Sequence, residues 1–329
     1  MATADQMKAL LESHVEGDDD RFVSVALQVA AQAARKGQSK LAEELRVLID
    51  RARAKQQAPV GPGQRPIPIA APRGELAGLL AATYPKARLA DMVLEARLRS
   101  RVERILTEVR QQHKLRAHGI QPRRKLLLLG PPGTGKTMTA SVLAGELGLP
   151  LLVVQLHALI TKFMGETAAK LRLVFDAMER SPGVYLFDEF DAIGAERASL
   201  NDVGEIRRIL NSFLQFLEQD ESSSLIVAAT NHVGVLDRAL FRRFDDVLEY
   251  GLPDARLVEE MLRNRLTGFA AAHFDWPATA AAASGLSHAD IVRACEDAAK
   301  TAILGDAAAV THDDVVSALQ ERRAISASS

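Results

Sequence analysis

A glycine-rich stretch near the middle of the chain has the residue types and spacing of a loop that binds phosphate. It satisfies G-x-x-x-x-G-K-[ST] at every position, follows an apolar run and precedes a helical pattern. Its residues are Gly130, Pro131, Pro132, Gly133, Thr134, Gly135, Lys136 and Thr137. Glycines let backbone N–H groups curl toward phosphate oxygens, and the N-terminus of the following helix adds partial positive charge. A solvated Gly-Pro turn would explain none of this context, so we expect ATP to bind here.

Side chains of this stretch have expected roles in holding ATP and Mg²⁺. Lys136 should reach the β- and γ-phosphates, and the Thr137 hydroxyl should coordinate the metal. Met138 lies in the first turn of the expected helix and completes the nucleotide-binding stretch.

A second signal is an acidic pair at the end of the apolar run Val184–Phe187. A carboxylate at the tip of a buried strand is costly unless a cation or water compensates it. Asp188 is therefore expected to hold the Mg²⁺ shell, and Glu189 to orient and polarise the attacking water. Acidic pairs end many strands, but together with the phosphate loop this one indicates ATP hydrolysis.

A third apolar run, Leu225–Ala229, is followed by Thr230 and Asn231. An Asn at a strand tip can hydrogen-bond both the γ-phosphate and the attacking water. A simple turn-forming Asn is the alternative.

These side chains need a sheet to position them, and the chain supplies one. From residue 125 onward, short apolar runs alternate with helical patterns, which predicts a parallel sheet of five strands covered by helices on both faces. The runs are Leu126–Leu129, Leu151–Leu156, Val184–Phe187, Leu225–Ala229 and a weaker Val247–Tyr250. We therefore expect an α/β domain over residues 75–252, followed by a small all-helical lid over 253–329.

The region before the sheet differs in composition. Residues 1–57 are rich in Ala, Leu, Glu and Arg with helical periodicity, which predicts a small helical domain that serves as an adaptor for a substrate or partner protein. Residues 58–74 shift to Pro, Gly and Gln, as in a semi-extended linker. The stretch Asp91–His118 is expected to form a long basic helix.

Overall composition is that of a cytoplasmic globular protein. The 329 residues carry a formal net charge of -1, which gives no reason to expect nucleic acid or an anionic membrane as a partner. The start lacks the features of a signal peptide, and no apolar run is long enough to span a membrane. The single cysteine, Cys295, cannot form an internal disulfide.

Across Ala87–Ala318 the chain resembles the AAA family of ATPases, a branch of the AAA+ superfamily. Gly130–Thr137 resembles its Walker A motif, Phe187–Glu189 its Walker B motif, and Asn231 its sensor 1. The stretch Leu236–Asp245 resembles the family's second region of homology.

In the family, arginines of the second region of homology reach the γ-phosphate held by a neighbouring subunit, which implies a homo-oligomeric ring, usually a hexamer. The family form separates two arginines by a Pro-Gly pair, which this chain lacks, so that Arg242 and Arg243 are adjacent. We expect Arg242 to be the principal finger and Arg243 the second. A solvated basic turn, or an ion pair with Asp245 or Asp246, is the alternative.

The resemblance also points to a base pocket. Ala90–Leu94 is similar to the stretch whose backbone lies along adenine, and Gly285–Ile291 resembles the Gly-rich element of the helical lid. His288 replaces a glycine of that element and is expected to crowd the pocket or to make a structural hydrogen bond, without a catalytic role.

The segment Thr161–Glu166 resembles the central pore loop of family members that thread polypeptide, such as katanin and spastin. Phe163 and Met164 would grip side chains, Gly165 would interrupt the helix at the loop tip, and Lys162 would add a positive rim. Alternatively, Phe163 and Met164 are core residues.

The leading functional prediction is a ring-forming ATPase that remodels, unfolds or disassembles proteins. Two alternatives stay open: a nucleic-acid-linked ATPase, such as a loader or transposition regulator, and a nucleotide-dependent switch. Support for nucleic acid comes from basic residues, although glutamates interleave them and aromatics for stacking bases are absent. The basic residues are Arg97, Arg99, Arg101, Arg104, Arg110, Lys114, Arg116, Arg123, Arg124 and Lys125.

Overall fold

The computed structural model describes residues 72 and 74–327, except 160–163, 191–202, 232–240 and 272. The expected N-terminal helices and nearly all of the expected linker lie outside the described residues.

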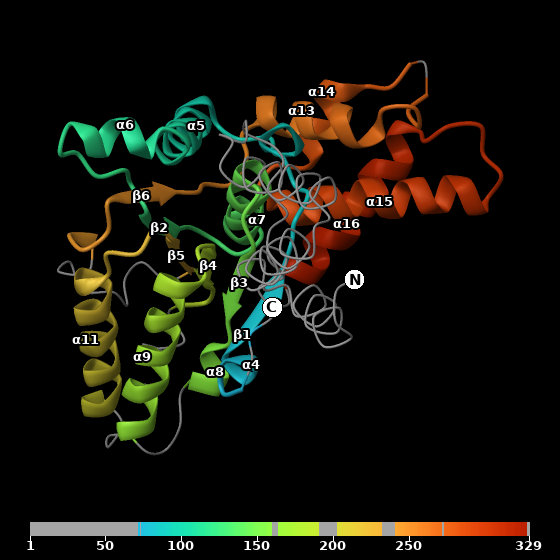
Figure 1. The fold of residues 1–329 in the computed structure, drawn as a ribbon. Helices are drawn as coiled ribbons and strands as arrows, with labels where there is room; N and C mark the ends of the chain where they lie inside the picture. Colours follow the sequence, from blue (N-terminus) through green and yellow to red (C-terminus); the bar gives the residue numbers. More distant parts are fainter. Residues whose placement is uncertain are drawn as a thin grey trace, which may run out of the picture. The chain divides into compact units, whose positions relative to one another are not determined.

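A six-stranded sheet in the order β1-β3-β4-β5-β2-β6 forms the centre of the fold (Figure 1). The strands are β1 (Leu80–Thr83), β2 (Lys125–Leu129), β3 (Leu151–Val154), β4 (Val184–Phe187), β5 (Leu225–Thr230) and β6 (Asp246–Glu249). The five predicted strands are confirmed and pair in parallel. The sixth, β1, was not predicted; it pairs antiparallel with β3 at the edge, where Leu80 lies opposite Val154. Only Leu80 of this short strand is buried, so it has no apolar run to reveal it.

Two hydrophobic layers cover the sheet, one on each face, because side chains alternate along a strand. On one face, Leu127, Tyr185 and Phe187 pack against α9 (Met164–Arg180) and α11 (Val203–Gln219), which lie side by side in Figure 1. On the other face, Leu126, Leu128 and Leu186 pack against α5 (Ala96–Arg110) and α7 (Lys136–Leu147). Burial on both faces explains why the parallel strands are continuous apolar runs.

The C-terminal helical region, α13–α16, has a hydrophobic core of its own, with residues from Val258 to Leu319. Its helices are α13 (Ala255–Leu266), α14 (Trp276–Ala282), α15 (His288–Leu304) and α16 (His312–Ala327). Short elements connect the rest of the fold: α4 (Leu76–Leu79), η1 (Leu89–Asp91), α6 (Gln112–Ala117) and α8 (Leu156–Leu159). No helix of the described residues is long and apolar enough to cross a membrane.

The long basic helix expected over Asp91–His118 is wrong at its start and in its middle. Asp91 ends the 3-10 turn η1, where its carboxylate accepts the Arg88 N–H at 2.7 Å, and the chain stays irregular until α5 begins at Ala96. Gln111, with φ -107° and ψ 21°, separates α5 from α6. The irregular stretch 92–95 becomes one wall of a cavity described below.

Candidate nucleotide-binding site

The phosphate loop joins the end of β2 to the start of α7. Gly130 has φ +150°, and a Cβ there would lie 2.2 Å from the carbonyl oxygen of Tyr250. Gly133 has φ +73°, and a Cβ there would lie 2.5 Å from the Ser287 Oγ. Both positions therefore need glycine, for backbone conformation and for space.

Lys136, the first residue of α7, is buried, and its ammonium group lies across the loop. Its Nζ donates to the carbonyl oxygens of Gly130 at 2.8 Å and Pro131 at 2.7 Å. The Thr134 hydroxyl donates to the same Pro131 carbonyl at 2.8 Å. Phosphate oxygens are anionic and accept stronger hydrogen bonds than neutral carbonyls, so this lysine is placed to exchange them for a phosphate.

Thr137 and Asp188 are brought together by α7 and β4. The Thr137 hydroxyl donates to Asp188 Oδ2 at 2.7 Å, and Asp188 Oδ1 accepts the backbone N–H of Glu189 at 2.9 Å. These oxygens are of the type that Mg²⁺ accepts beside phosphate and water ligands. The residues predicted to serve as metal ligands are thus neighbours in space.

Glu189 is exposed and has an uncommon backbone conformation, with φ +50°. The next residue, Phe190, is fully buried and donates its N–H to the Ala229 carbonyl oxygen at 2.8 Å. The backbone of Glu189 is thereby fixed on both sides, by the Asp188 carboxylate and by the buried Phe190. Left-handed backbone at a non-glycine residue costs about 1–2 kcal/mol and is typical of functional sites.

Asn231 directly follows β5 at the same edge of the sheet. Thr230 is paired with Leu129, and the Gly130 N–H donates to the Thr230 carbonyl oxygen at 3.3 Å. Asn231 thus lies beside the start of the phosphate loop, on a strand adjacent to both β2 and β4. The structure places it with Lys136, Thr137 and Asp188; its role as a sensor stays a prediction.

Arg242 and Arg243 lie at the opposite edge of the sheet, in the turn before β6. Because β6 is parallel to β2, with Asp246 beside Leu126 and Glu249 beside Leu129, this turn lies at the amino ends of both strands. The phosphate loop lies at their carboxyl ends. At about 3.3 Å per residue, the length of β6 separates the two by ~13 Å.

The two arginines differ in their surroundings. Arg243 forms an ion pair with Glu218 of α11, whereas Arg242 is exposed and pairs with none of the described residues. The alternative that they pair with Asp245 or Asp246 is wrong. Asp245 accepts the backbone N–H groups of Arg124 and Lys125, both at 2.9 Å, and Asp246 pairs with Arg101 and Arg123.

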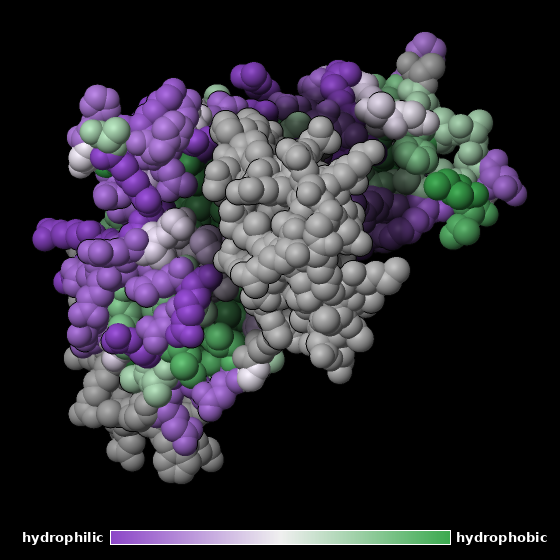
Figure 2. Space-filling view, in the orientation of Figure 1, coloured by the Kyte–Doolittle hydropathy of each residue, from purple (hydrophilic) through white to green (hydrophobic). Residues whose placement is uncertain are grey.

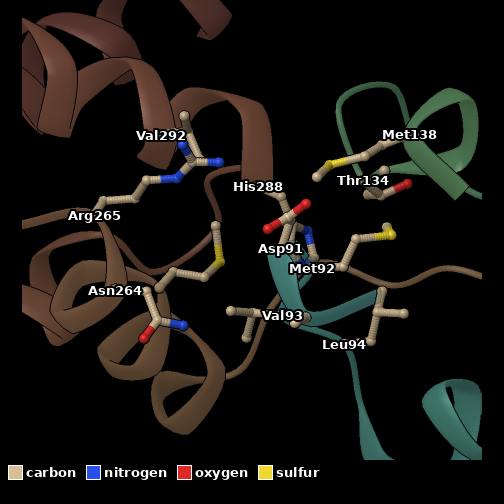
Figure 3. A pocket seen from close by; sticks show the side chains of 13 residues that line it. Asp91, Met92, Val93, Leu94, Thr134, Met138, Asn264, Arg265, His288 and Val292 are labelled. Atoms are coloured by element: carbon tan, nitrogen blue, oxygen red, sulfur yellow. The ribbon is translucent and has the colours of Figure 1, made fainter. Parts of the chain in front are cut away.

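A cavity of about 500 Å³ lies between the phosphate loop, the stretch 90–94 and the C-terminal helical region (Figure 3). The expected adenine stretch Ala90–Leu94 lines it, together with Thr134, Gly135 and Met138. His288 and Val292 from α15 and Asn264 and Arg265 from α13 form the other wall, as Figure 3 shows. The volume and the mixture of apolar walls with a few polar groups suit a nucleoside.

The C-terminal helical region also contacts the phosphate loop directly. The Ala289 N–H donates to the Gly133 carbonyl oxygen at 2.9 Å. This hydrogen bond ties the first turn of α15 to the loop.

Many of the basic residues near the start of the sheet have partners within the chain. Their partners are as follows: Arg99 with Glu103, Arg101 with Asp246, Arg110 with Glu146, Arg123 with Glu108 and Arg124 with Asp220. Figure 2 shows α5 and α6 as a mostly hydrophilic surface in the upper left. Five of the ten basic residues singled out in the sequence are thus used in ion pairs within the chain.

The first half of the predicted pore loop, including Lys162 and Phe163, lies outside the described residues. Met164 and Gly165 are described as the first two residues of α9. The sequence predicted that Gly165 interrupts the helix, but Gly165 lies in the first turn of α9. Glycine is tolerated there because the backbone N–H groups of the first turn have no partner within the helix.

Sequence reasoning missed several residues of the site. The Tyr250 hydroxyl is 2.7 Å from Thr139 Oγ1 of α7, and burial raises the pKa of Tyr250 to about 12. Asn264 and Arg265 reach the cavity from a helix that was expected only as part of an Ala-rich region. No local motif marks any of these residues, because their positions depend on contacts between distant parts of the chain.

The parallel sheet, the phosphate loop after β2, and the acidic tip of β4 define a P-loop nucleotide-binding protein with a helical C-terminal region. Comparison with known proteins specifies the family. Residues 126–252 match the ATPase family associated with various cellular activities (AAA). The chain is 36% identical over 323 residues to the AAA family ATPase y4kL of Sinorhizobium fredii, covering 98% of this chain and 96% of that protein. The chain therefore belongs to the AAA family of ATPases.

Two other relatives carry names that describe an activity. The chain is 34% identical over 240 residues to the proteasome-activating nucleotidase of Aeropyrum pernix, covering 70% of this chain and 58% of that protein. It is 35% identical over 226 residues to the ATP-dependent zinc metalloprotease FtsH 4 of Sphaerobacter thermophilus, covering 66% of this chain and 34% of that protein. In these two proteins, large parts lie outside the similarity.

Proposed function

We propose that the chain is a Mg²⁺-dependent ATPase that assembles into a ring of six copies, as the family resemblance implies, and remodels protein substrates. The observation that carries the ring is the position of Arg242, exposed, without a partner among the described residues, and at the sheet edge remote from its own phosphate loop. An arginine there cannot serve its own ATP, but in a head-to-tail ring it can serve a neighbour's.

The hydrolytic chemistry follows from the carboxyl edge of the sheet. Mg²⁺ would be held through Thr137 and Asp188, whose oxygens already lie 2.7 Å apart, and it would neutralise charge on the phosphates. Glu189 would orient the attacking water and accept its proton, and Asn231 would contact the γ-phosphate. A guanidinium from the neighbouring chain would complete the site, an effect worth about 10³–10⁵ in rate.

A protein substrate is favoured by the named relatives and by the pore-type segment Lys162–Gly165. A proteasome-activating nucleotidase and an ATP-dependent protease both work on proteins according to their names. The residues before 58 would then be the adaptor that selects the substrate or partner. Proteolysis itself is not part of the proposal, since the similarity to the protease covers only 34% of that protein.

Ion pairing within the chain counts against the nucleic-acid alternative. Its best argument was the run of basic residues, and Arg101, Arg110, Arg123 and Arg124 are ion-paired with carboxylates of the same chain. A groove that follows a phosphate backbone needs cations available to it.

A mixing experiment tests the shared site. Arg242→Ala and Lys136→Ala proteins should each hydrolyse ATP poorly, and a 1:1 mixture should regain about one quarter of the parent rate, because that share of head-to-tail interfaces combines an intact lysine with an intact arginine. Arg243→Ala tests the expected second finger: because Arg243 pairs with Glu218 of its own chain, its loss should lower activity less than the loss of Arg242.

If the mixture regains no ATPase activity although the two variants assemble with each other, the site is not shared between chains. Adding an unfolded polypeptide or DNA to the parent protein separates the substrate classes. A rise in ATPase rate with polypeptide alone supports remodelling of proteins, and a rise with DNA alone contradicts it.

A further inference from the structure

His288 is a cavity-lining residue whose imidazole has no partner. It is the first residue of α15, and its Nδ1 is buried without a hydrogen bond. Neither nitrogen of the ring hydrogen-bonds to any residue of the described chain. Buried polar atoms in folded proteins are nearly always paired, and those that are not usually have a reason.

The backbone around His288 is fixed on both sides. Ser287 caps the helix, with its Oγ accepting the Asp290 N–H at 3.2 Å and donating to the Asp290 carboxylate at 2.6 Å. On the other side, the Ala289 N–H is bound to the Gly133 carbonyl oxygen. The side chain of His288 is thus presented to the cavity by a rigid turn, while its ring orientation is not fixed by any hydrogen bond.

The opposite walls of this cavity are what a purine requires. Met92 and Met138 provide apolar, polarisable surface, and the chain is irregular over 92–95, so the backbone groups of Val93 and Leu94 are not used in a helix. In such a pocket, a small number of polar side chains decides which ligand is bound.

We propose that His288 is a nucleobase-recognition residue whose neutral imidazole accepts a hydrogen bond from the exocyclic amine of adenine. This inference rests on the proposed binding of ATP at the phosphate loop. Rotation about the side-chain bonds presents a ring nitrogen to the base, and the ring gains the partner that the protein does not supply. A base without that amine leaves the acceptor unpaired, which is the basis of selection.

Burial, not a neighbouring charge, favours the neutral form of the ring. Of the charged groups that line the cavity, Asp91 lies on the wall opposite His288 and Arg265 on the same wall, while Asp290 on the same helix is occupied by Ser287. Burial lowers the pKa of His288 below the ordinary value of 6.5. The imidazole is therefore neutral at pH 7, and acid conditions convert the acceptor into a donor that adenine's amine cannot use.

The test compares ATP with purine riboside triphosphate, which lacks the amine, in equilibrium binding to the parent and to His288→Ala. Loss of the amine should weaken binding to the parent about 2- to 10-fold, and this ratio should approach one in His288→Ala. His288→Gln keeps a polar acceptor without a titration and should restore part of the ratio. Val292→Ala is the control, since it removes apolar contact from the same wall and should weaken both nucleotides equally.

Acidification gives an independent readout. The ATP-to-purine riboside triphosphate affinity ratio of the parent should shrink in acid, below the ordinary histidine pKa of 6.5, whereas the ratio of His288→Gln should not change, because glutamine does not titrate. Binding of 2′-deoxy-ATP tests the alternative that His288 hydrogen-bonds to the 2′-hydroxyl of the ribose instead of the base.

An unchanged amine ratio in folded His288→Ala and His288→Gln, with melting temperatures near that of the parent, overturns the inference. So does a change confined to 2′-deoxy-ATP, which would assign the contact to the ribose. Failure of the parent to bind ATP at all would instead contradict the proposed function.

Discussion

The two ends of the parallel strands, here called the carboxyl edge and the amino edge of the sheet, differ in how their charged residues are paired. At the carboxyl edge, Lys136 donates to the carbonyl oxygens of Gly130 and Pro131, and Asp188 accepts the Thr137 hydroxyl. At the amino edge, Arg124 is paired with Asp220, and Asp246 with Arg101. The amino edge therefore holds its charges in internal ion pairs, with Arg242 as the exception, whereas the carboxyl edge holds Lys136 and Asp188 beside neutral groups of the phosphate loop and of α7. A charged residue in a sequence indicates function only together with the contacts that the fold gives it.

The largest expected effect is at the carboxyl edge, in Lys136→Ala. The loop loses the buried ammonium group that bridges Gly130 and Pro131 and faces the phosphates, so ATP binding should fall below detection in calorimetry or fluorescence titration. The melting temperature without nucleotide should change little. Binding at parental affinity would remove the phosphate loop from the proposed site.

At the amino edge, Asp220→Asn should act on stability instead of binding. The Arg124 and Asp220 side chains are 11% and 2% exposed, so removing one charge leaves the other buried, at a cost of about 3–5 kcal/mol in the free energy of unfolding. Denaturant unfolding measures this loss, and nucleotide affinity below the transition should be parental.

Asp176→Asn is the matched control for that comparison. Its partner is Arg172, four residues earlier on α9, and the two side chains are 39% and 61% exposed. An exposed pair of this type contributes at most about 0.5 kcal/mol. If Asp220→Asn and Asp176→Asn lower the free energy of unfolding equally, buried and exposed ion pairs contribute equally to stability, and this prediction is wrong.

A further effect at the carboxyl edge, on turnover alone, is expected in Glu189→Gln. The amide keeps the shape of the side chain but cannot accept a proton, so turnover should fall at least about 100-fold, or ~2.7 kcal/mol in the barrier, with ATP binding intact. Steady-state phosphate release beside a binding titration checks this. Parental turnover would place the general base elsewhere at this edge.

The carboxyl edge could be predicted from sequence because its candidate site residues lie in short, continuous sequence motifs. The loop Gly130–Thr137 is continuous in the chain, and Asp188 follows a strand that is apolar on both faces. Parallel strands then bring their tips together without further information. The register of Leu129 with Thr230 and of Phe187 with Ala228 shows that this inference from topology holds.

The amino edge and the base cavity could not be predicted in this way. Arg124 and Asp220 are 96 residues apart, and nothing local to either shows that they meet. The edge strand β1 buries only Leu80, and helical periodicity in the residues after 95 extends the predicted helix over 92–95, where the chain is irregular. His288 was recognised as a substituted position, but whether it faces a cavity depends on the packing of α13, α15 and η1.

The backbone of Glu189 has a consequence for how this protein would respond to selection. Its φ of +50° is a conformation in which glycine has no steric cost, so a glycine there would relieve a conformational strain of about 1–2 kcal/mol. A search for heat-resistant variants, blind to activity, would therefore be drawn to this position early. The selected protein would have a larger free energy of unfolding but would lack the Glu189 carboxylate. At the tip of β4, stability favours glycine and the proposed catalysis requires glutamate.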